Sequence, residues 1–271
     1  MYLVHCYDPS EDEWTDLPPL PVRSFGLGQV SGKLVAVGGK TEDSQITNNV
    51  YMYDPISEEW VKKMSMQIPR ASSTVVGLKS ALVVVGGYTS SEYVDLVEII
   101  DPHTREKQKS EPLPIAGSNM SAFPIDENEC YILGGYKPFP TSTSCDNKVF
   151  HAKLDNLLRK ATSTEHTTPV DTQPAWKSLP STPTYQPAAA MLVGSLFALG
   201  GWETSAGKIA STKIHAYSPS TNSWLYVDDL PAPRAVTTAA VLSPTTLLVI
   251  GGYDNSKRVN IVYKGTLTIR M

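Results

Sequence analysis

The doublet Gly-Gly ends a short apolar run five times in this chain, and this recurrence constrains the fold more than any other feature. The doublets are Gly38-Gly39, Gly86-Gly87, Gly134-Gly135, Gly200-Gly201 and Gly251-Gly252, at intervals of 48, 48, 66 and 51 residues. A period of roughly 50 residues is the signature of a repeat architecture, in which one small unit packs against copies of itself.

Further landmarks keep the same period. Four apolar runs close at a turn, and these turns are Tyr7-Asp8-Pro9, Tyr53-Asp54-Pro55, Ile100-Asp101-Pro102 and Tyr217-Ser218-Pro219. Seven residues after the first position of each turn stand Trp14, Trp60, Lys107 and Trp224. A Leu-Pro or Ile-Pro step follows in each unit, so several landmarks recur in one order.

Each unit predicts four short strands and shows no helical periodicity. In the second unit the expected strands are Ser24–Val30, Lys33–Val37, Asn49–Tyr53 and Glu59–Lys62. A four-stranded sheet repeated at this interval is a β-propeller blade. We expect the Gly pairs where blades crowd together and a Cβ would obstruct the backbone. The Trp on the outer strand is expected to fill the wedge between neighbouring blades.

These landmarks resemble the kelch repeat, and the resemblance covers essentially the whole chain. It implies an all-β fold, a kelch-type β-propeller forming one domain over residues 1–271. The chain opens at a third strand, Tyr2–Tyr7, and closes after another, Val259–Tyr263. Counting strands favours six blades with an incomplete first blade, whose missing strands would lie before Met1. The alternative is five blades, with residues 1–17 completing the sheet begun by Ala235–Gly252.

The interval between the third and fourth Gly-Gly pairs holds an insertion at residues 137–175. It predicts a strand around Lys148–Leu154, a short helical turn in Asp155–Lys160 and a loop over Ala161–Ala175. This insertion is either a tolerated surface segment or a partner-binding loop. The basic run Arg105–Lys109, where the Ile100 unit lacks its Trp, is expected to be a solvated edge.

Charge and cysteine content narrow the function classes. The net charge of −4 argues against a general nucleic-acid binder. Cys6, Cys130 and Cys145 are too few and too scattered for a secreted disulfide scaffold, so reduced thiols and a cytoplasmic location are expected. The sequence predicts neither a signal peptide nor a membrane span.

No catalytic or metal-ligand motif is apparent. The five histidines are dispersed, and none has metal-ligand spacing with a Cys or a carboxylate. Copper-dependent kelch-fold sugar oxidases are an enzyme alternative, but no histidine falls in a loop expected at the propeller channel. We therefore expect neither enzymatic activity nor a cofactor.

Two sets of loop residues are candidates for partner binding. Arg23, Arg70 and Arg234 stand just ahead of a first strand, and the residues that follow the Gly pairs are Lys40, Tyr88, Tyr136, Trp202 and Tyr253. Arg can grip a carboxylate with two hydrogen bonds, and Arg, Tyr and Trp are frequent interface anchors. Side chains at repeat positions can instead brace neighbouring loops.

The resemblance sharpens this hypothesis. In kelch substrate adaptors that capture acidic peptides, the arginine before the first strand and the tyrosine after the Gly pair line the binding mouth. That pattern implicates Arg23, Arg70 and Arg234 with Tyr88, Tyr136 and Tyr253, whereas Trp202 and Lys40 depart from it. The expected function is a non-catalytic module for a peptide or protein partner, such as the recognition part of a ubiquitin-ligase substrate adaptor or a signalling protein. An actin-binding or cytoskeletal scaffold is the alternative.

Overall fold

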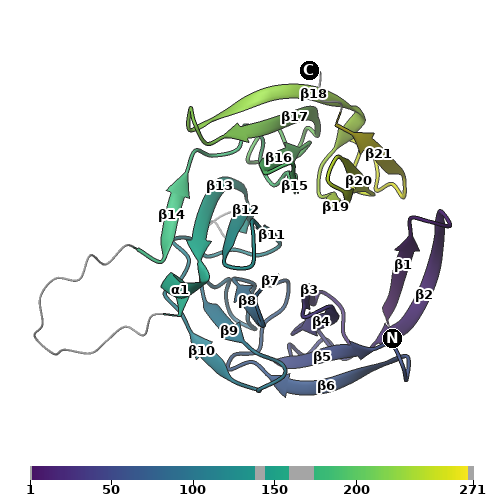
Figure 1. Ribbon diagram of the computed structural model, residues 1–271, viewed down its shortest axis with the longest axis vertical. Helices are drawn as coiled ribbons and strands as arrows, with labels where there is room; N and C mark the ends of the chain where they lie inside the picture. The colour runs from purple at the N-terminus through teal and green to yellow at the C-terminus, as the bar shows by residue number, and fades with distance from the viewer. Residues whose placement is uncertain (1, 138–143, 159–173, 268–271) are drawn as a thin grey trace, which may run out of the picture. The chain divides into compact units, whose positions relative to one another are not determined.

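The computed structural model of the chain describes residues 2–137, 144–158 and 174–267 (Figure 1). These residues form two compact units, and each is considered by itself. Unit 1 holds residues 2–119, 126–129, 152–158 and 174–176, and unit 2 holds residues 120–125, 130–137, 144–151 and 177–267. Most of the loop expected at Ala161–Ala175 lies outside the described residues.

Nearly all regular structure in the described residues is β-strand, as predicted. The first ten strands are β1 (Tyr2–Asp8), β2 (Glu13–Leu20), β3 (Gly26–Val30), β4 (Lys33–Val37), β5 (Asn49–Asp54), β6 (Glu59–Ser65), β7 (Thr74–Leu78), β8 (Ala81–Val85), β9 (Val97–Ile100) and β10 (Lys107–Lys109). The remaining elements are β11 (Ser121–Pro124), β12 (Glu129–Lys137), β13 (Ser144–Lys153), α1 (Leu154–Leu157), β14 (Trp176–Leu179), β15 (Ala188–Leu192), β16 (Ser195–Leu199), β17 (Ser211–Ser218), β18 (Ser223–Arg234), β19 (Thr238–Ser243), β20 (Thr246–Ile250) and β21 (Val262–Thr266).

The strands pair in chain order into six sheets. Four sheets have four strands, namely β3–β6, β7–β10, β11–β14 and β15–β18. The strands β19, β20 and β21 form a three-stranded sheet, and β1 pairs with β2. Five sheets therefore contain the strand pair that ends at a Gly-Gly, which matches the five-bladed alternative, with β1–β2 in addition. One detail of that alternative is wrong, because the third strand beside β20 is β21 and not residues 1–17.

The Gly pairs lie where one blade meets the backbone entering the next. Gly38 and Gly39 have φ of +66° and +102°, and an added Cβ on Gly38 would stand 2.2 Å from the Arg70 carbonyl oxygen. The Gly39 amide donates to that same carbonyl at 2.8 Å. Gly201 and Arg234 repeat this hydrogen bond in unit 2, also at 2.8 Å. Positive φ and close backbone approach together exclude a side chain, as the sequence predicted.

The tryptophans that recur in the sequence connect the outer strand of one blade to the outer-strand segment of the preceding blade. Trp60 Nε1 donates to the Pro18 carbonyl at 2.9 Å, and Trp224 Nε1 donates to the Pro180 carbonyl at 2.9 Å. Lys107, in the Trp position of its unit, keeps the connection through Nζ, which donates to the Ser65 carbonyl at 3.1 Å. The outer-strand side chain thus bridges consecutive blades, even where Lys replaces Trp.

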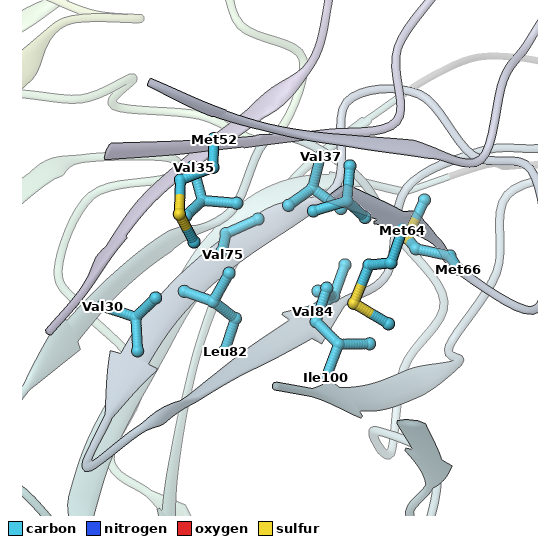
Figure 2. Packing of buried hydrophobic residues seen from close by; sticks show 11 residues of the cluster. Val30, Val35, Val37, Met52, Met64, Met66, Val75, Leu82, Val84 and Ile100 are labelled. Atoms are coloured by element: carbon cyan, nitrogen blue, oxygen red, sulfur yellow. The ribbon is translucent and has the colours of Figure 1, made fainter. Parts of the chain in front are cut away.

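Apolar side chains from neighbouring sheets fill the space between blades. Between the β3–β6 and β7–β10 sheets lies a cluster that includes Val35, Met64, Leu82, Val84 and Ile100 (Figure 2). Runs such as Ala81–Val85 are buried on both faces, which explains their continuous apolar sequence. This core fixes the blades that carry the candidate loops.

Candidate functional site

A left-handed residue marks the entry to the first strand of every Gly-Gly unit. These residues are Ser24, Ser72, Asn119, Gln186 and Val236, with φ between 49° and 52°. A non-glycine residue with positive φ is uncommon, and for β-branched Val it is strained. Because these residues recur at the same place, the entry loops of the five Gly-Gly units can be aligned on them residue by residue.

Main-chain hydrogen bonds join each entry loop to the loop that follows the Gly pair. Arg23 and Lys40 exchange hydrogen bonds of 2.8 and 2.7 Å, and Ala71 and Tyr88 exchange bonds of 3.0 and 2.9 Å. The same bridge joins Tyr185 to Trp202 and Ala235 to Tyr253. The two loop types expected to form one surface are therefore adjacent in each of these four units.

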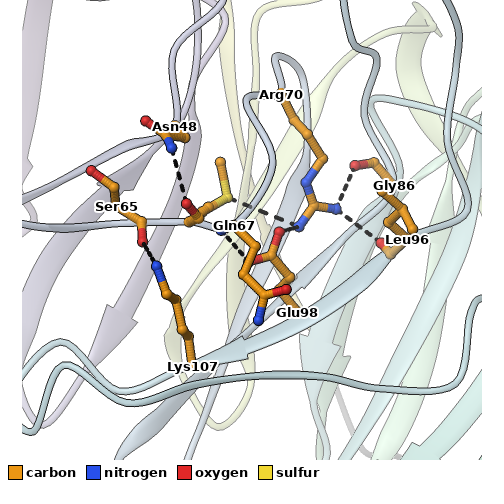
Figure 3. Close-up of polar contacts among 9 residues, drawn as sticks. Asn48, Ser65, Gln67, Arg70, Gly86, Leu96, Glu98 and Lys107 are labelled. Carbon is orange, nitrogen blue, oxygen red and sulfur yellow. Dashed lines mark hydrogen bonds and ion pairs between the residues drawn. The ribbon is translucent and has the colours of Figure 1, made fainter.

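Arg70 does not reach that surface. Its side chain is fully buried, and its guanidinium donates to the carbonyls of Gly86 and Leu96 at 3.0 and 2.9 Å and to Glu98 Oε1 at 3.0 Å (Figure 3). Glu98 in turn accepts a hydrogen bond through Oε2 from the main-chain N–H of Gln67. Burial lowers the pKa of Arg70, and the charge of Glu98 opposes that effect. Arg70 supports the packing of two blades and cannot also grip a partner.

Arg234 is placed in the same way in unit 2. It is 1% exposed, and Nη2 donates to the Tyr263 hydroxyl at 2.8 Å. Its guanidinium carbon lies 4.9 Å from the centroid of the Tyr263 ring, and Nη1 donates to the Pro233 carbonyl. Tyr263 therefore takes the place that Glu98 has beside Arg70.

The sequence-based grouping of the three arginines was one residue out of register. Arg70 and Arg234 stand two residues before their left-handed residue, whereas Arg23 stands directly before Ser24. Its counterparts are Ala71 and Ala235, and neighbouring side chains of extended backbone point to opposite sides. Counting back from the Gly pair separates Arg23 from the other two, because Arg23 precedes Gly38 by 15 residues, whereas Arg70 precedes Gly86 by 16 and Arg234 precedes Gly251 by 17.

Arg23 is exposed and forms part of a cationic and aromatic surface, the unit 1 loop patch, made of Arg23, Lys40, Tyr88 and Tyr93. Arg23 Nη2 donates to Ser44 Oγ at 2.9 Å. Lys40 Nζ lies 5.0 Å from the Tyr88 ring centroid, and the rings of Tyr88 and Tyr93 are 5.7 Å apart. In the part of the chain that the structure describes, neither cation has a carboxylate partner.

The candidates of unit 2 gather into an aromatic cluster instead, made of Tyr136, Tyr185, Trp202 and Tyr253. Trp202 and Tyr253 have ring centroids 5.5 Å apart, and Cys145 packs beside them. Trp202 is only 6% exposed, so it mainly braces these loops. Burial raises the pKa of the Cys145 thiol to about 11, which makes it a poor nucleophile. Tyr185 was not among the sequence candidates, although it stands at the Arg23 position of its unit.

No group of three His, Cys, Asp or Glu side chains that could hold a metal ion occurs within residues 2–137, 144–158 and 174–267. Within the same residues, no helix is long and apolar enough to cross a membrane.

Comparison with known proteins identifies the repeat. The KLHDC2/KLHL20/DRC7 Kelch-repeats domain matches residues 24–252, which is most of the chain. The chain belongs to the kelch-repeat family. Its all-β fold is therefore a kelch-type propeller, as the repeat landmarks indicated. The solved structure of YjhT has the same fold, with a TM-score of 0.72, 17% identity, and coverage of 92% of this chain and 84% of that one.

Two curated Kelch-like proteins are similar to this chain over most of its length. Kelch-like protein 25 of Xenopus tropicalis is 26% identical over 89% of the chain, and human Kelch-like protein 23 is 23% identical over 94%. Alpha-scruin of Limulus polyphemus is 23% identical over 58% of the chain and 18% of its own length. The chain spans 38% of that Kelch-like protein 25 and 42% of Kelch-like protein 23.

Proposed function

We propose that this kelch chain is a non-catalytic interaction module that binds an acidic peptide or protein segment at the unit 1 loop patch. The observation that carries the proposal is a pair of cations, the exposed Arg23 and the half-buried Lys40 beside the Tyr88 ring, neither of which has a carboxylate partner among the described residues. The backbone bridge between Arg23 and Lys40 holds the two loops together, which lowers the cost of ordering them on binding.

The similarity to two Kelch-like proteins supports a recognition role within a longer polypeptide, because each is similar to this chain over less than half of its own length. In such a protein, the kelch module would select the substrate for a ubiquitin ligase or a signalling domain. We expect it to act in the cytoplasm, with its three cysteines reduced.

The test reverses charge at the patch. A short fluorescent peptide of alternating Glu and Ser should bind the chain, and binding should weaken at high salt because the patch attracts it electrostatically. Arg23→Glu with Lys40→Glu should weaken binding at least about tenfold. Lys33→Glu with Lys62→Glu makes the same charge change at exposed sites outside the patch and should weaken it much less. Equal loss in both double variants would show that net charge, and not this patch, attracts the peptide.

A cytoskeletal scaffold is the second candidate, and one observation favours it. The outer strand β18 carries Leu225 and Tyr226, which are 53% and 57% exposed, on the side of a blade and not at its loops. Co-sedimentation with actin filaments should then succeed for the chain and fail for Leu225→Asp with Tyr226→Asp. Failure of the unaltered chain to sediment would eliminate this candidate.

A further inference from the structure

The loop that follows the first Gly pair brings a serine hydroxyl to Arg23. Ser44 is exposed, and its Oγ accepts a hydrogen bond from Arg23 Nη2 at 2.9 Å. Among the described residues, this is the only hydrogen bond that the Arg23 guanidinium donates. A guanidinium carries five N–H donors, so that of Arg23 can bind several more acceptor atoms at this place.

The loop backbone holds Ser44 in that position. Its main-chain N–H donates to the Thr41 carbonyl at 3.0 Å, and Ser44 has a φ of +64°, which is uncommon for a residue other than glycine. The Thr41 hydroxyl donates to the carboxylate of Asp43. In the described part of the chain, Asp43 forms no ion pair with Arg23. The loop therefore presents a hydroxyl to this cation, and not a carboxylate.

This contact is specific to one unit. The entry-loop residue that is bridged to the loop after the Gly pair is Arg23 in the Gly38 unit, whereas the other three bridged units have Ala71, Tyr185 and Ala235. None of these three side chains carries a positive charge. Of the four bridged units, only the Gly38 unit therefore presents a cation from its bridged entry-loop position to the neighbouring loop.

We propose that Ser44 is a phosphorylation site and that its phosphate blocks the unit 1 loop patch, an inference that rests on the proposed function. An ATP-dependent serine kinase supplies the phosphoryl group. Ser44 Oγ forms a bond to the γ-phosphorus of ATP, and the bond from that phosphorus to the oxygen bridging to the β-phosphate breaks. ADP leaves with that oxygen, and the hydroxyl proton passes to a base of the kinase.

The added phosphate suits Arg23 in charge and in geometry. It carries a charge of about −1.5 to −2 at pH 7, and a guanidinium can bind its oxygens through two parallel hydrogen bonds. Because the loop already places Ser44 Oγ 2.9 Å from Nη2, the phosphate binds within the chain, and an acidic peptide has to displace it. The phosphate also offsets the positive charges of Arg23 and Lys40, so the patch attracts an acidic ligand much less.

Phosphorus NMR tests the contact between the phosphate and Arg23 without any peptide. Amber-codon suppression places phosphoserine at position 44 of the whole chain. Its second pKa should lie below the usual value of about 6, because Arg23 stabilises the doubly charged phosphate, and Arg23→Gln should raise it again. The matched control is phosphoserine at Ser57, an exposed residue in the turn between β5 and β6 of the same sheet. Equal pKa values at positions 44 and 57 would overturn the proposal.

Fluorescence anisotropy with the peptide of alternating Glu and Ser tests the block. Phosphoserine at position 44 should weaken binding of this peptide at least about tenfold, which is within the usual range of coupling between two ligands. Phosphoserine at position 57 adds the same charge outside the patch and should weaken binding much less. Equal weakening by both would show an effect of net charge alone and would overturn the block.

Mass spectrometry tests the modification itself. The whole chain, incubated with ATP in a eukaryotic cell extract that contains phosphatase inhibitors, should acquire a phosphate on Ser44. Absence of that phosphate would overturn the assignment of Ser44 as a phosphorylation site.

Failure of the proposed function and failure of the switch give different results. If the unaltered chain does not bind the peptide, the proposed function fails and the block fails with it, whereas the phosphorus titration still decides whether the phosphate contacts Arg23. If the chain with phosphoserine at position 44 binds the peptide as well as the unaltered chain does, the block is overturned and the proposed function stands.

Discussion

Arg70 and Glu98 form an ion pair of 3.0 Å in which neither side chain is more than 1% exposed. The pair joins the loop ahead of β7 to β9, the third strand of the same sheet, and two main-chain carbonyls and one main-chain amide make further hydrogen bonds to it. A buried pair of this kind is sensitive to the loss of one partner, because the other charge is then left without compensation.

Removing one charge of this pair should therefore cost more than removing both. Arg70→Met should lower the free energy of unfolding by roughly 3–5 kcal/mol, because Glu98 stays buried alone. The double variant Arg70→Met with Glu98→Leu should recover part of that loss. Urea denaturation of the single and double variants measures both values. Equal destabilisation by Arg70→Met and by the double variant would show that a buried, unpaired Glu98 costs nothing, and would contradict this prediction.

The indole bridge of Trp60 should contribute measurably to stability. Trp60→Phe keeps most of the ring but removes the hydrogen bond to the Pro18 carbonyl, so a loss of about 1 kcal/mol is expected. Trp60 packs against the Tyr53 ring at 5.3 Å, and Trp14 packs in the same way against Tyr7 at 5.1 Å. Trp14 is 48% exposed, however, and Trp14→Phe should cost much less. Thermal unfolding of the two variants side by side makes the comparison.

The Gly pairs should tolerate alanine less well than a glycine in an open turn. Gly32→Ala meets only the penalty for a positive φ, about 1 kcal/mol, because no atom lies within 4 Å of the added Cβ. At Gly39 the added Cβ would also stand 2.6 Å from the Arg23 carbonyl oxygen. Gly39→Ala should therefore destabilise the chain clearly more than Gly32→Ala in chemical denaturation, and similar losses would contradict the crowding argument.

The carboxylate of Asp229 should titrate far below its usual range. Hydrogen bonds from Thr212, Tyr226 and Lys213 lower the pKa of Asp229 to about 2. Because the folded pKa is below the unfolded value, the stabilisation is present above about pH 4 and is lost as the pH falls towards 2. An NMR titration of the Asp229 carboxyl carbon should show this midpoint, and Thr212→Val should raise it. A midpoint near 4 in the unaltered chain would exclude these hydrogen bonds in solution.

The fold could be predicted largely because its landmarks are backbone requirements. The expected strand Lys33–Val37 matches β4, and Asn49–Tyr53 is one residue shorter than β5. In the insertion, the expected strand around Lys148–Leu154 falls mostly within the longer β13, and the expected helical turn overlaps α1. Gly and Pro report directly on backbone geometry, so their spacing is readable without a structure.

The candidate site was less predictable because it depends on which way a side chain points. A shift of one residue in the spacing to the Gly pair separates the exposed Arg23 from the buried Arg70, and that spacing alone does not say which of the two side chains points outward. The Arg70–Glu98 pair links positions 28 residues apart, so only the packing of the loop ahead of β7 against β9 reveals why that arginine is inside. The Gly pairs located the loops, whereas side-chain direction had to come from the structure.

The paired main-chain hydrogen bonds between Arg23 and Lys40 recur between Ala71 and Tyr88, with quite different side chains on the same backbone. Since the loop geometry is held by amides and carbonyls that every residue but proline carries, the residues at these positions can change without altering the frame. When a gene duplicates such a repeat, the copy keeps the same loop backbone, and the side chains on that backbone can then diverge. Copies within one chain can thus acquire separate specificities, such as a cationic surface in one unit and an aromatic one in another.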